Sequence, residues 1–357
     1  MRDALTGHPL FNDAIRLDRS RLRLLAPLRI AIVATGLVVV CLATDHKADV
    51  VPLTIGAVFV AAADLGEIPG QRWRTMLWTT TSLTLAAELG GLFSERNLVT
   101  FLVTLLVAAV CGFGGALSYR GGLIGVLSLV VFCAFSGAPS GMRATEINAL
   151  LIALGGLVIT VVTVAPYLAR HWSSLAVAAP DALTGPRGFW SRFRDCCVPS
   201  NRFFWHAIRL PVGIGIATLI AWNVPVMHAY WIPVTVAWVT LPDSRLTSVK
   251  VVARIVGTMV GALAAAVLLL PWMNQGLLAA FVVGLGAYLT VAFLFAFYAV
   301  AVTGITMVIL GVFSVVGDSI VDDIVVRIIA TVVAAGIVVL VTLTWSKAAQ
   351  RSHVRAE

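Results

Sequence analysis

Charged residues are scarce in this chain of 357 residues. Asp, Glu, Lys and Arg make up only 12% of it, while 60% of the residues are hydrophobic. A soluble protein of this length carries roughly twice that charged fraction. The apolar residues also fall into long blocks, which is typical of membrane-spanning helices rather than of the core of a soluble domain. The composition therefore predicts an all-α integral membrane protein.

The motifs on which many enzymes and metalloproteins depend are missing as well. The sequence contains no Gly-Lys-Ser/Thr loop, so we expect no ATP hydrolysis. No His, Cys and Asp cluster has the spacing of a metal site, and no Ser-His-Asp arrangement can be nominated. Three of the five cysteines lie inside apolar runs and the other two are adjacent, so we expect all five to be reduced. We predict no enzymatic activity, no cofactor and no bound metal.

Twelve apolar segments could form helices that cross a bilayer, which takes about 20 residues at 1.5 Å per residue. The second and eighth are short, and only the alignment of Tyr298 with Tyr119 separates the tenth from the eleventh. The predicted spans are 25–44, 50–65, 74–93, 98–117, 121–138, 147–169, 204–222, 227–242, 251–270, 275–292, 296–316 and 324–345.

The second half of the sequence repeats the first at an offset of about 180 residues. The matched pairs are Arg29 and Arg209, Pro52 and Pro233, Thr54 and Thr235, Arg74 and Arg254, and Tyr119 and Tyr298. Each half holds six predicted spans, so both halves enter the membrane in the same direction. We therefore predict two parallel six-helix pseudo-repeats, an arrangement typical of transporters.

The basic residues predict the orientation. With the N-terminus in the cytoplasm, nineteen Lys and Arg residues fall on the cytoplasmic side and three, Lys47, Arg96 and Arg143, on the other. This asymmetry follows the positive-inside rule, and it explains the net charge of +8 better than nucleic-acid binding does. We predict a multi-pass membrane protein with both termini cytoplasmic. Its parts are an N-terminal segment (1–24), a first repeat (25–169), a cytoplasmic linker (170–203), a second repeat (204–346) and a tail (347–357).

Four arginines are candidates for binding an anionic substrate. Arg29 and Arg209 each lie about one turn inside the first span of their half, and Arg74 and Arg254 begin the third. A charged Arg inside a membrane is costly, and its planar fork suits a carboxylate. The alternative is that Arg29 and Arg209 only reach back to the cytoplasmic interface and anchor the helices.

Two Pro-x-Thr pairs occupy equivalent places in the second and eighth spans: Pro52 with Thr54, and Pro233 with Thr235. Proline removes a backbone donor, so each pair could open its helix at the centre of the membrane, where many transporters bind substrate. An ordinary kinked helix is the alternative.

Three carboxylates are candidates for proton coupling. Glu88 lies deepest in a predicted span, and Asp64 and Asp243 lie at the ends of two others. An intramembrane carboxylate is a functional candidate because its burial is costly. For Asp243 the alternative is a structural ion pair with a nearby arginine, and Glu88 has no acidic counterpart in the second half.

Several motifs of the second half lie at a characteristic spacing. They are Tyr230-Trp231-Ile232-Pro233-Val234-Thr235, Pro242-Asp243, the run Arg254–Gly261 containing Gly257-Thr258, and Tyr298–Thr303. With them the chain resembles the fusaric acid resistance protein-like (FUSC) family, which is related to the aromatic acid exporters. The first half is similar, with Pro52, Thr54 and Arg74 in register, and the resemblance covers residues from about 20 to 346.

The resemblance implies a bacterial inner-membrane protein, a proton-gradient-driven exporter of aromatic or other amphipathic organic acids. It also implies a periplasmic adaptor and an outer-membrane channel as partners, and small-residue helix faces suggest a homodimer. A similarity to plant malate channels keeps an organic-anion channel open, and a non-transporting envelope scaffold is the third reading.

Overall fold

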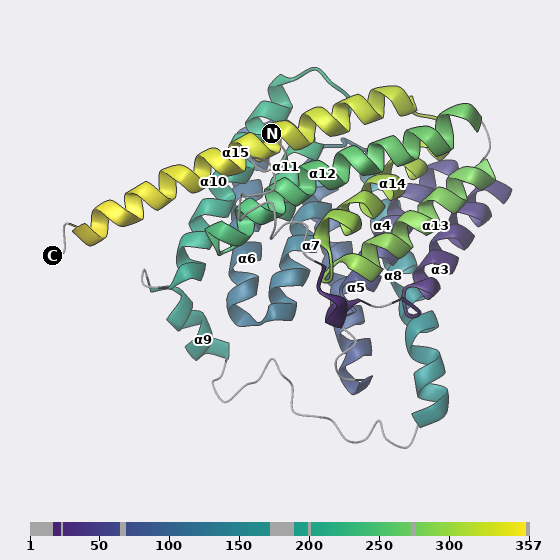
Figure 1. Cartoon of the computed structure of the whole chain (residues 1–357), viewed down its shortest axis with the longest axis horizontal. Coiled ribbons are helices and arrows are strands. Elements are labelled where there is room, and N and C mark those ends of the chain that lie inside the picture. The colour runs from purple at the N-terminus through teal and green to yellow at the C-terminus, as the bar shows by residue number, and fades with distance from the viewer. Residues whose placement is uncertain are drawn as a thin grey trace, which may run out of the picture.

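A computed structural model describes residues 17–22, 24–64, 69–171, 189–198, 201–272 and 276–354. These residues form a bundle of helices and contain no strand (Figure 1). The main helices are α3 (Leu28–Ala43), α4 (Val50–Ala62), α5 (Pro69–Leu92), α6 (Leu98–Leu117), α7 (Tyr119–Ser136), α8 (Met142–His171), α10 (Arg202–Asn223), α11 (Trp231–Val239), α12 (Ser244–Leu269), α13 (Gly276–Phe293), α14 (Tyr298–Val316) and α15 (Ile320–Val354).

These helices confirm the all-α fold class, and each one overlaps a predicted span. The uncertain boundary between the tenth and eleventh spans is real, because α13 ends at Phe293 and α14 begins at Tyr298. A short helix, α9 (Phe189–Cys196), lies in the predicted linker. Among the described residues, eight helices are long and apolar enough to cross a membrane: α6, α7, α8, α10, α12, α13, α14 and α15. The chain is therefore a multi-pass membrane protein.

Local side-chain chemistry sets several helix ends. Asn97 and Ser118 accept hydrogen bonds from the backbone amides of Thr100 and Gly121, which caps the N-termini of α6 and α7. Gly317, with φ of 106°, ends α14 in the left-handed conformation that glycine adopts without strain. Such ends explain why turns of only a few residues separate these helices.

Equivalent helices of the two halves make equivalent contacts. Within the halves, α5 packs on α7 as α12 packs on α14, and α4 packs on α8 as α11 packs on α15. Between the halves, α3 packs on α13 and the equivalent α10 packs on α6. Figure 1 shows these two crossings at opposite ends of the bundle. The sequence duplication therefore survives as a pseudo-symmetric arrangement in which each half supplies a helix to the other.

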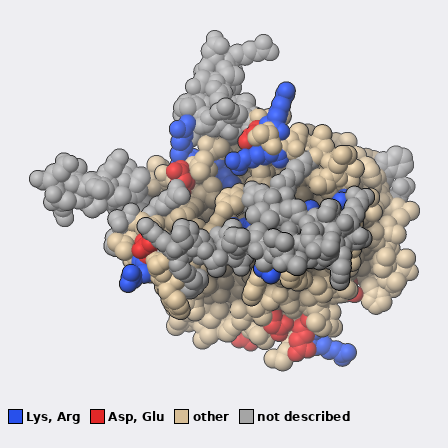
Figure 2. Space-filling model, turned by 90° about the horizontal axis from the view of Figure 1, so that it is seen from below, with Lys and Arg blue, Asp and Glu red and all other residues tan. Residues whose placement is uncertain are grey.

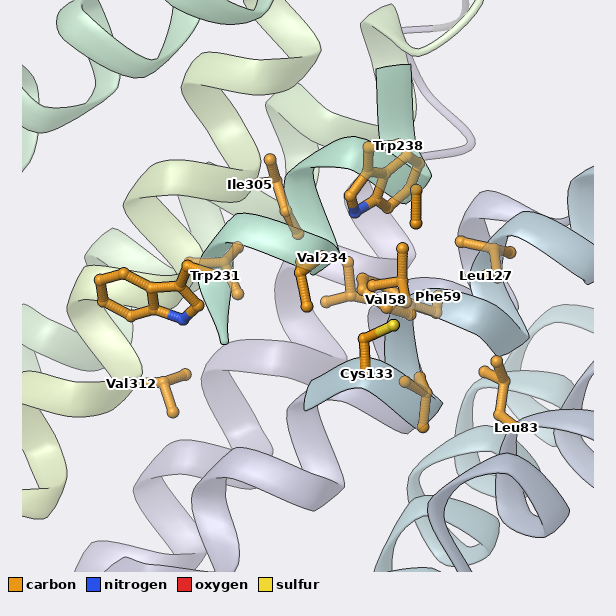
Figure 3. Packing of buried hydrophobic residues seen from close by; sticks show 14 of the residues in the cluster. Val58, Phe59, Leu83, Leu127, Cys133, Trp231, Val234, Trp238, Ile305 and Val312 are labelled. Carbon is orange, nitrogen blue, oxygen red and sulfur yellow. The ribbon is translucent and has the colours of Figure 1, made fainter. Parts of the chain in front are cut away.

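The two short helices lie at the centre. Every residue of α11 is buried, as are eleven of the thirteen residues of α4. Figure 3 shows Val234 of α11 beside Val58 of α4, and Phe59 of α4 meets Trp238 of α11 edge-on at 5.8 Å. Because longer helices surround them, α4 and α11 do not need the length of a membrane span.

The outer surface is apolar in the way a bilayer requires. Helix α6 exposes Leu98, Leu102, Leu106 and Val110, which lie four residues apart and so share one face. In Figure 2 a group of Asp and Glu residues lies along the lower edge, most visible Lys and Arg residues lie higher, and uncharged surface separates them. Which of these sides is cytoplasmic stays a prediction from the charge count.

The crossing of α3 and α13 predicts a steric requirement at Gly284. A Cβ atom there would overlap Oγ1 of Thr35 and lie 3.0 Å from the Ala31 carbonyl oxygen. We expect Gly284→Ala to lower the free energy of unfolding by about 1–3 kcal/mol, because overpacking forces the helices apart. Gly336→Ala is the matched control, since nothing lies within 4 Å of that position. Equal thermal stability of the two variants in detergent would argue against the packing.

The orientation can be tested by thiol labelling. Cys197 is exposed beside α9, whereas Cys41 and Cys133 are buried. In a Cys196→Ser variant, a membrane-impermeant maleimide should label Cys197 in inside-out vesicles and not in intact right-side-out vesicles. Labelling of the right-side-out vesicles would reverse the predicted orientation.

Candidate functional site

An apolar cavity of about 120 Å³ lies where the two halves meet. We call it the inner cavity. Its walls come from the equivalent pairs α4 with α11 and α7 with α14, and one residue of α15 completes it. Aromatic side chains supply much of the lining, among them Phe59, Trp231, Trp238 and Phe313. The only charged residue among those that line it is Arg327.

Arg327 is fully buried, with 0% of its surface exposed. Within the described part of the chain, none of its three guanidinium nitrogens has a hydrogen-bond partner. The guanidinium lies over the ring of Trp231 with Cζ 5.1 Å from the ring centroid. This cation–π contact contributes about 0.5–2 kcal/mol, far less than the cost of burying a charge. A negatively charged group in the inner cavity would offset that cost.

A second buried arginine reinforces the positive charge. Arg254 on α12 is 2% exposed, and two of its nitrogens, Nε and Nη2, have no hydrogen-bond partner among the described residues. It interacts electrostatically with Tyr298 of α14 and with Arg327. The ammonium of Lys250 lies 4.7 Å from the Tyr298 ring centroid. Two buried arginines and a partly buried lysine of the second half therefore lie close together.

A larger cavity of about 600 Å³, the outer cavity, lies at the predicted outer ends of α4 and α11. It shares Val51, Phe135, Ala138, Tyr230 and Phe313 with the inner cavity, so the two spaces adjoin. It is more polar than the inner cavity, because its lining includes Arg96, Asn148 and His228.

A third cavity of about 500 Å³, the lower cavity, lies at the opposite end of α4. Arg29, Asp64 and Arg72 line it, with further side chains from α8 and α13. One face of α4 borders all three cavities. Val51 lines both the outer and the inner cavity, Ile55 and Val58 line the inner cavity, and Ala62 lines the lower cavity. These residues are three or four apart, the spacing of a single helix face. The three cavities therefore follow α4 in series.

The predicted anion residues lie in four different settings. Arg29 lines the lower cavity, where its Nη1 is 3.5 Å from the Thr163 carbonyl oxygen. Arg209 is buried and donates a hydrogen bond to the Leu241 carbonyl just beyond α11. Arg29 and Arg209 line no common cavity among those described. Arg74 is exposed beside the Trp73 ring, 5.3 Å from its centroid, so of the four only Arg254 joins the buried cluster.

The predicted opening of helices at Pro52 and Pro233 is wrong. Pro52 is the third residue of α4 and Pro233 is the third residue of α11. In the first turn a proline loses no intrahelical hydrogen bond, so neither residue interrupts its helix. Both prolines instead line the outer cavity. The hydroxyls of Thr54 and Thr235, two residues further along each helix, are buried, and neither has a hydrogen-bond partner among the described residues.

The three carboxylates are not brought together. Glu88 is partly buried on α5 and lines none of the described cavities. Asp64 forms an ion pair with Arg72 in the lower cavity. Asp243 is exposed and accepts a hydrogen bond from the amide of Leu246, 2.9 Å away, which caps α12. Asp243 therefore has at least a structural role, as the cap of α12.

The sequence reasoning missed the residue that distinguishes the site. Arg327 was visible as a charge inside an apolar span, but no cation in the first half matches it. At the offset that pairs Tyr119 with Tyr298, its counterpart is Asn148. A search for charges that break the repeat would have found Arg327, although not its contact with Trp231, which is remote in the sequence.

Comparison with known families confirms the resemblance for the second half. Residues 216–341 match the family described as fusaric acid resistance protein-like. The matched segment contains Arg254 and every residue that the second half contributes to the inner cavity, among them Trp231 and Arg327. The chain has no match among curated proteins or among solved structures.

Because Arg327 is buried without a hydrogen-bond partner among the described residues, we expect it to lower the stability of the folded protein. Arg327→Met should raise the free energy of unfolding by about 1–4 kcal/mol, the range seen when apolar residues replace buried charges. Arg209→Met is the contrasting variant, because removing a hydrogen-bonded guanidinium should destabilise the protein. Thermal unfolding in detergent would measure both, and a less stable Arg327→Met protein would show that Arg327 is a structural residue.

Proposed function

We propose that this membrane protein transports amphipathic organic anions. The proposal rests above all on Arg327, a buried guanidinium without a hydrogen-bond partner among the described residues, which borders an apolar cavity between the two halves. The family match of the second half supports a transport-related role. The duplicated architecture supports it too, since transporters commonly bind substrate between repeats.

The cavity favours a particular chemistry. A guanidinium can hold both oxygens of a carboxylate, whereas the aromatic and aliphatic walls favour an apolar body. The inner cavity, about 120 Å³, is comparable to an apolar cavity of about 150 Å³ that holds benzene. Small aromatic carboxylates combine the charge and the body that this space accepts.

The cavity sizes favour a carrier over a channel. The inner cavity is much smaller than the spaces of about 600 and 500 Å³ that precede and follow it along α4. An open channel needs a continuous wide path, whereas a carrier closes around its substrate between two vestibules. The scaffold reading gives no reason to retain a buried, unpaired charge that costs stability.

We extend the proposal to direction and coupling. The transporter would export its substrate from the cytoplasm across a bacterial inner membrane at the expense of the proton gradient. It would work with a periplasmic adaptor and an outer-membrane channel, and could do so as a homodimer. These details are supported by the family resemblance alone. Asp64 in the lower cavity is the better placed of the original coupling candidates, because Glu88 borders no described cavity.

Flux through proteoliposomes tests the proposal. Vesicles containing the protein should move radiolabelled benzoate faster than empty vesicles, and an imposed pH gradient should increase the rate. Arg327→Met should reduce this flux to the level of empty vesicles, because the carboxylate loses its counter-charge.

Arg74→Gln is the control, since Arg74 is exposed and borders none of the described cavities. It should transport like the wild type. Flux that survives Arg327→Met would remove Arg327 from the pathway, and unitary currents in planar bilayers would favour the channel instead.

A further inference from the structure

A second cluster of side chains borders the outer cavity and packs against aromatic residues that also line the inner cavity. His228 precedes α11, Asp318 follows α14, and Asp323 lies in the first turn of α15. One nitrogen of His228 and one oxygen of each carboxylate lie within 4.8 Å of one another. Nε2 of His228 is 3.2 Å from Oδ2 of Asp318 and 3.5 Å from Oδ1 of Asp323.

The surrounding residues hold His228 in one orientation. Its Nδ1 lies 3.0 Å from the hydroxyl of Tyr230, so Nε2 is the nitrogen that faces the carboxylates. The imidazole stacks on Trp231 with centroids 4.9 Å apart and touches the Phe313 ring at 4.5 Å. The backbone of His228 adopts φ of 60°, an uncommon conformation for a residue other than glycine. Such backbone strain is typical of functional sites.

The two carboxylates are also placed by their backbone. Gly317, in the left-handed conformation, turns the chain directly before Asp318. Asp323 is only 3% exposed, and its Oδ2 has no hydrogen-bond partner among the described residues. A buried carboxylate oxygen without a donor is costly, so this oxygen points to a ligand that the protein itself does not provide.

The charges around the cluster require a cation. When Nδ1 carries the imidazole proton, it donates a hydrogen bond to the Tyr230 hydroxyl, and the lone pair of Nε2 faces the two carboxylates. Three acceptors, Nε2 and one oxygen of each carboxylate, then converge on one point. A neutral imidazole is the form that coordinates metals. Asp322 adds further negative charge nearby, while Arg327 lies one turn beyond Asp323.

We infer that His228, Asp318 and Asp323 bind a divalent transition-metal ion such as Zn²⁺. One imidazole and two carboxylates form a common ligand set for such ions, and they leave coordination positions for water or a substrate oxygen. The bound ion would join the segment before α11 to the start of α15 at the edge of the outer cavity. Sequence spacing could not show this site, because His228 and Asp318 are far apart in the chain.

The site is expected in the second half alone. At the repeat offset that pairs Pro52 with Pro233, the counterpart of His228 is Lys47, a cation that would repel a metal ion. The inference does not depend on the proposed anion transport, since it concerns different side chains and a separate binding measurement.

Titration calorimetry with ZnCl₂ on the purified full chain, carrying no histidine tag, tests the inference. The wild type should bind one Zn²⁺ per chain. His228→Gln and Asp323→Asn should each weaken the binding at least about tenfold, because each removes one of three ligands. His46→Gln is the control, since His46 is exposed and outside the cluster, and it should bind Zn²⁺ like the wild type.

X-ray absorption at the zinc edge should show one imidazole among nitrogen and oxygen ligands at about 2.0–2.2 Å. Tyr230→Phe should weaken Zn²⁺ binding by about 10–100-fold, because it removes the group that orients the imidazole. Thermal unfolding without metal checks that each variant is folded. The absence of stoichiometric binding by the wild type, or equal affinity in a folded His228→Gln variant, would overturn the metal site and leave a proton on His228 as the cation.

Discussion

A charge in an apolar interior must be neutralised, and this requirement shapes the centre of the protein. Arg327 contacts Trp231 but donates no hydrogen bond within the described chain, and Arg254 is buried nearby with two free nitrogens. Two buried guanidinium groups repel each other, so the arrangement stabilises an anion more than it stabilises the protein. A fold selected for stability alone would carry apolar residues here. The cluster therefore indicates a binding site whose stability cost is accepted for function.

The helix arrangement explains where this charge can be kept. The short helices α4 and α11 occupy the interior, and longer helices shield them from lipid. The exchange of α3 and α10 between the halves closes the bundle on both sides. The inner cavity lies at the interface between the repeats, where α4 and α7 of the first half face α11 and α14 of the second.

The sequence predicted the helices well and the site only in part. Apolar blocks and cations in the loops are local signals, so each of the twelve predicted spans has its helix. The prediction that the Pro-x-Thr pairs open their helices was wrong because the sequence does not show where each helix begins. A proline in the first turn therefore could not be distinguished from a proline at the helix centre. Asp243 caps α12, which its place at the end of a predicted span does not reveal, and its part in proton coupling stays a prediction. The contacts of Arg327 with Trp231, and of His228 with Asp318, join residues that no local pattern connects.

Crystals grown with 4-bromobenzoate would test the central claim directly, because bromine gives an anomalous signal that marks the ligand without bias. The account predicts one strong bromine peak among the apolar side chains of α4, α7, α11 and α14, with the carboxylate within hydrogen-bond distance of Arg327. A peak confined to the lower cavity beside Arg29, or no peak at saturating ligand, would contradict the claim that Arg327 holds the transported anion.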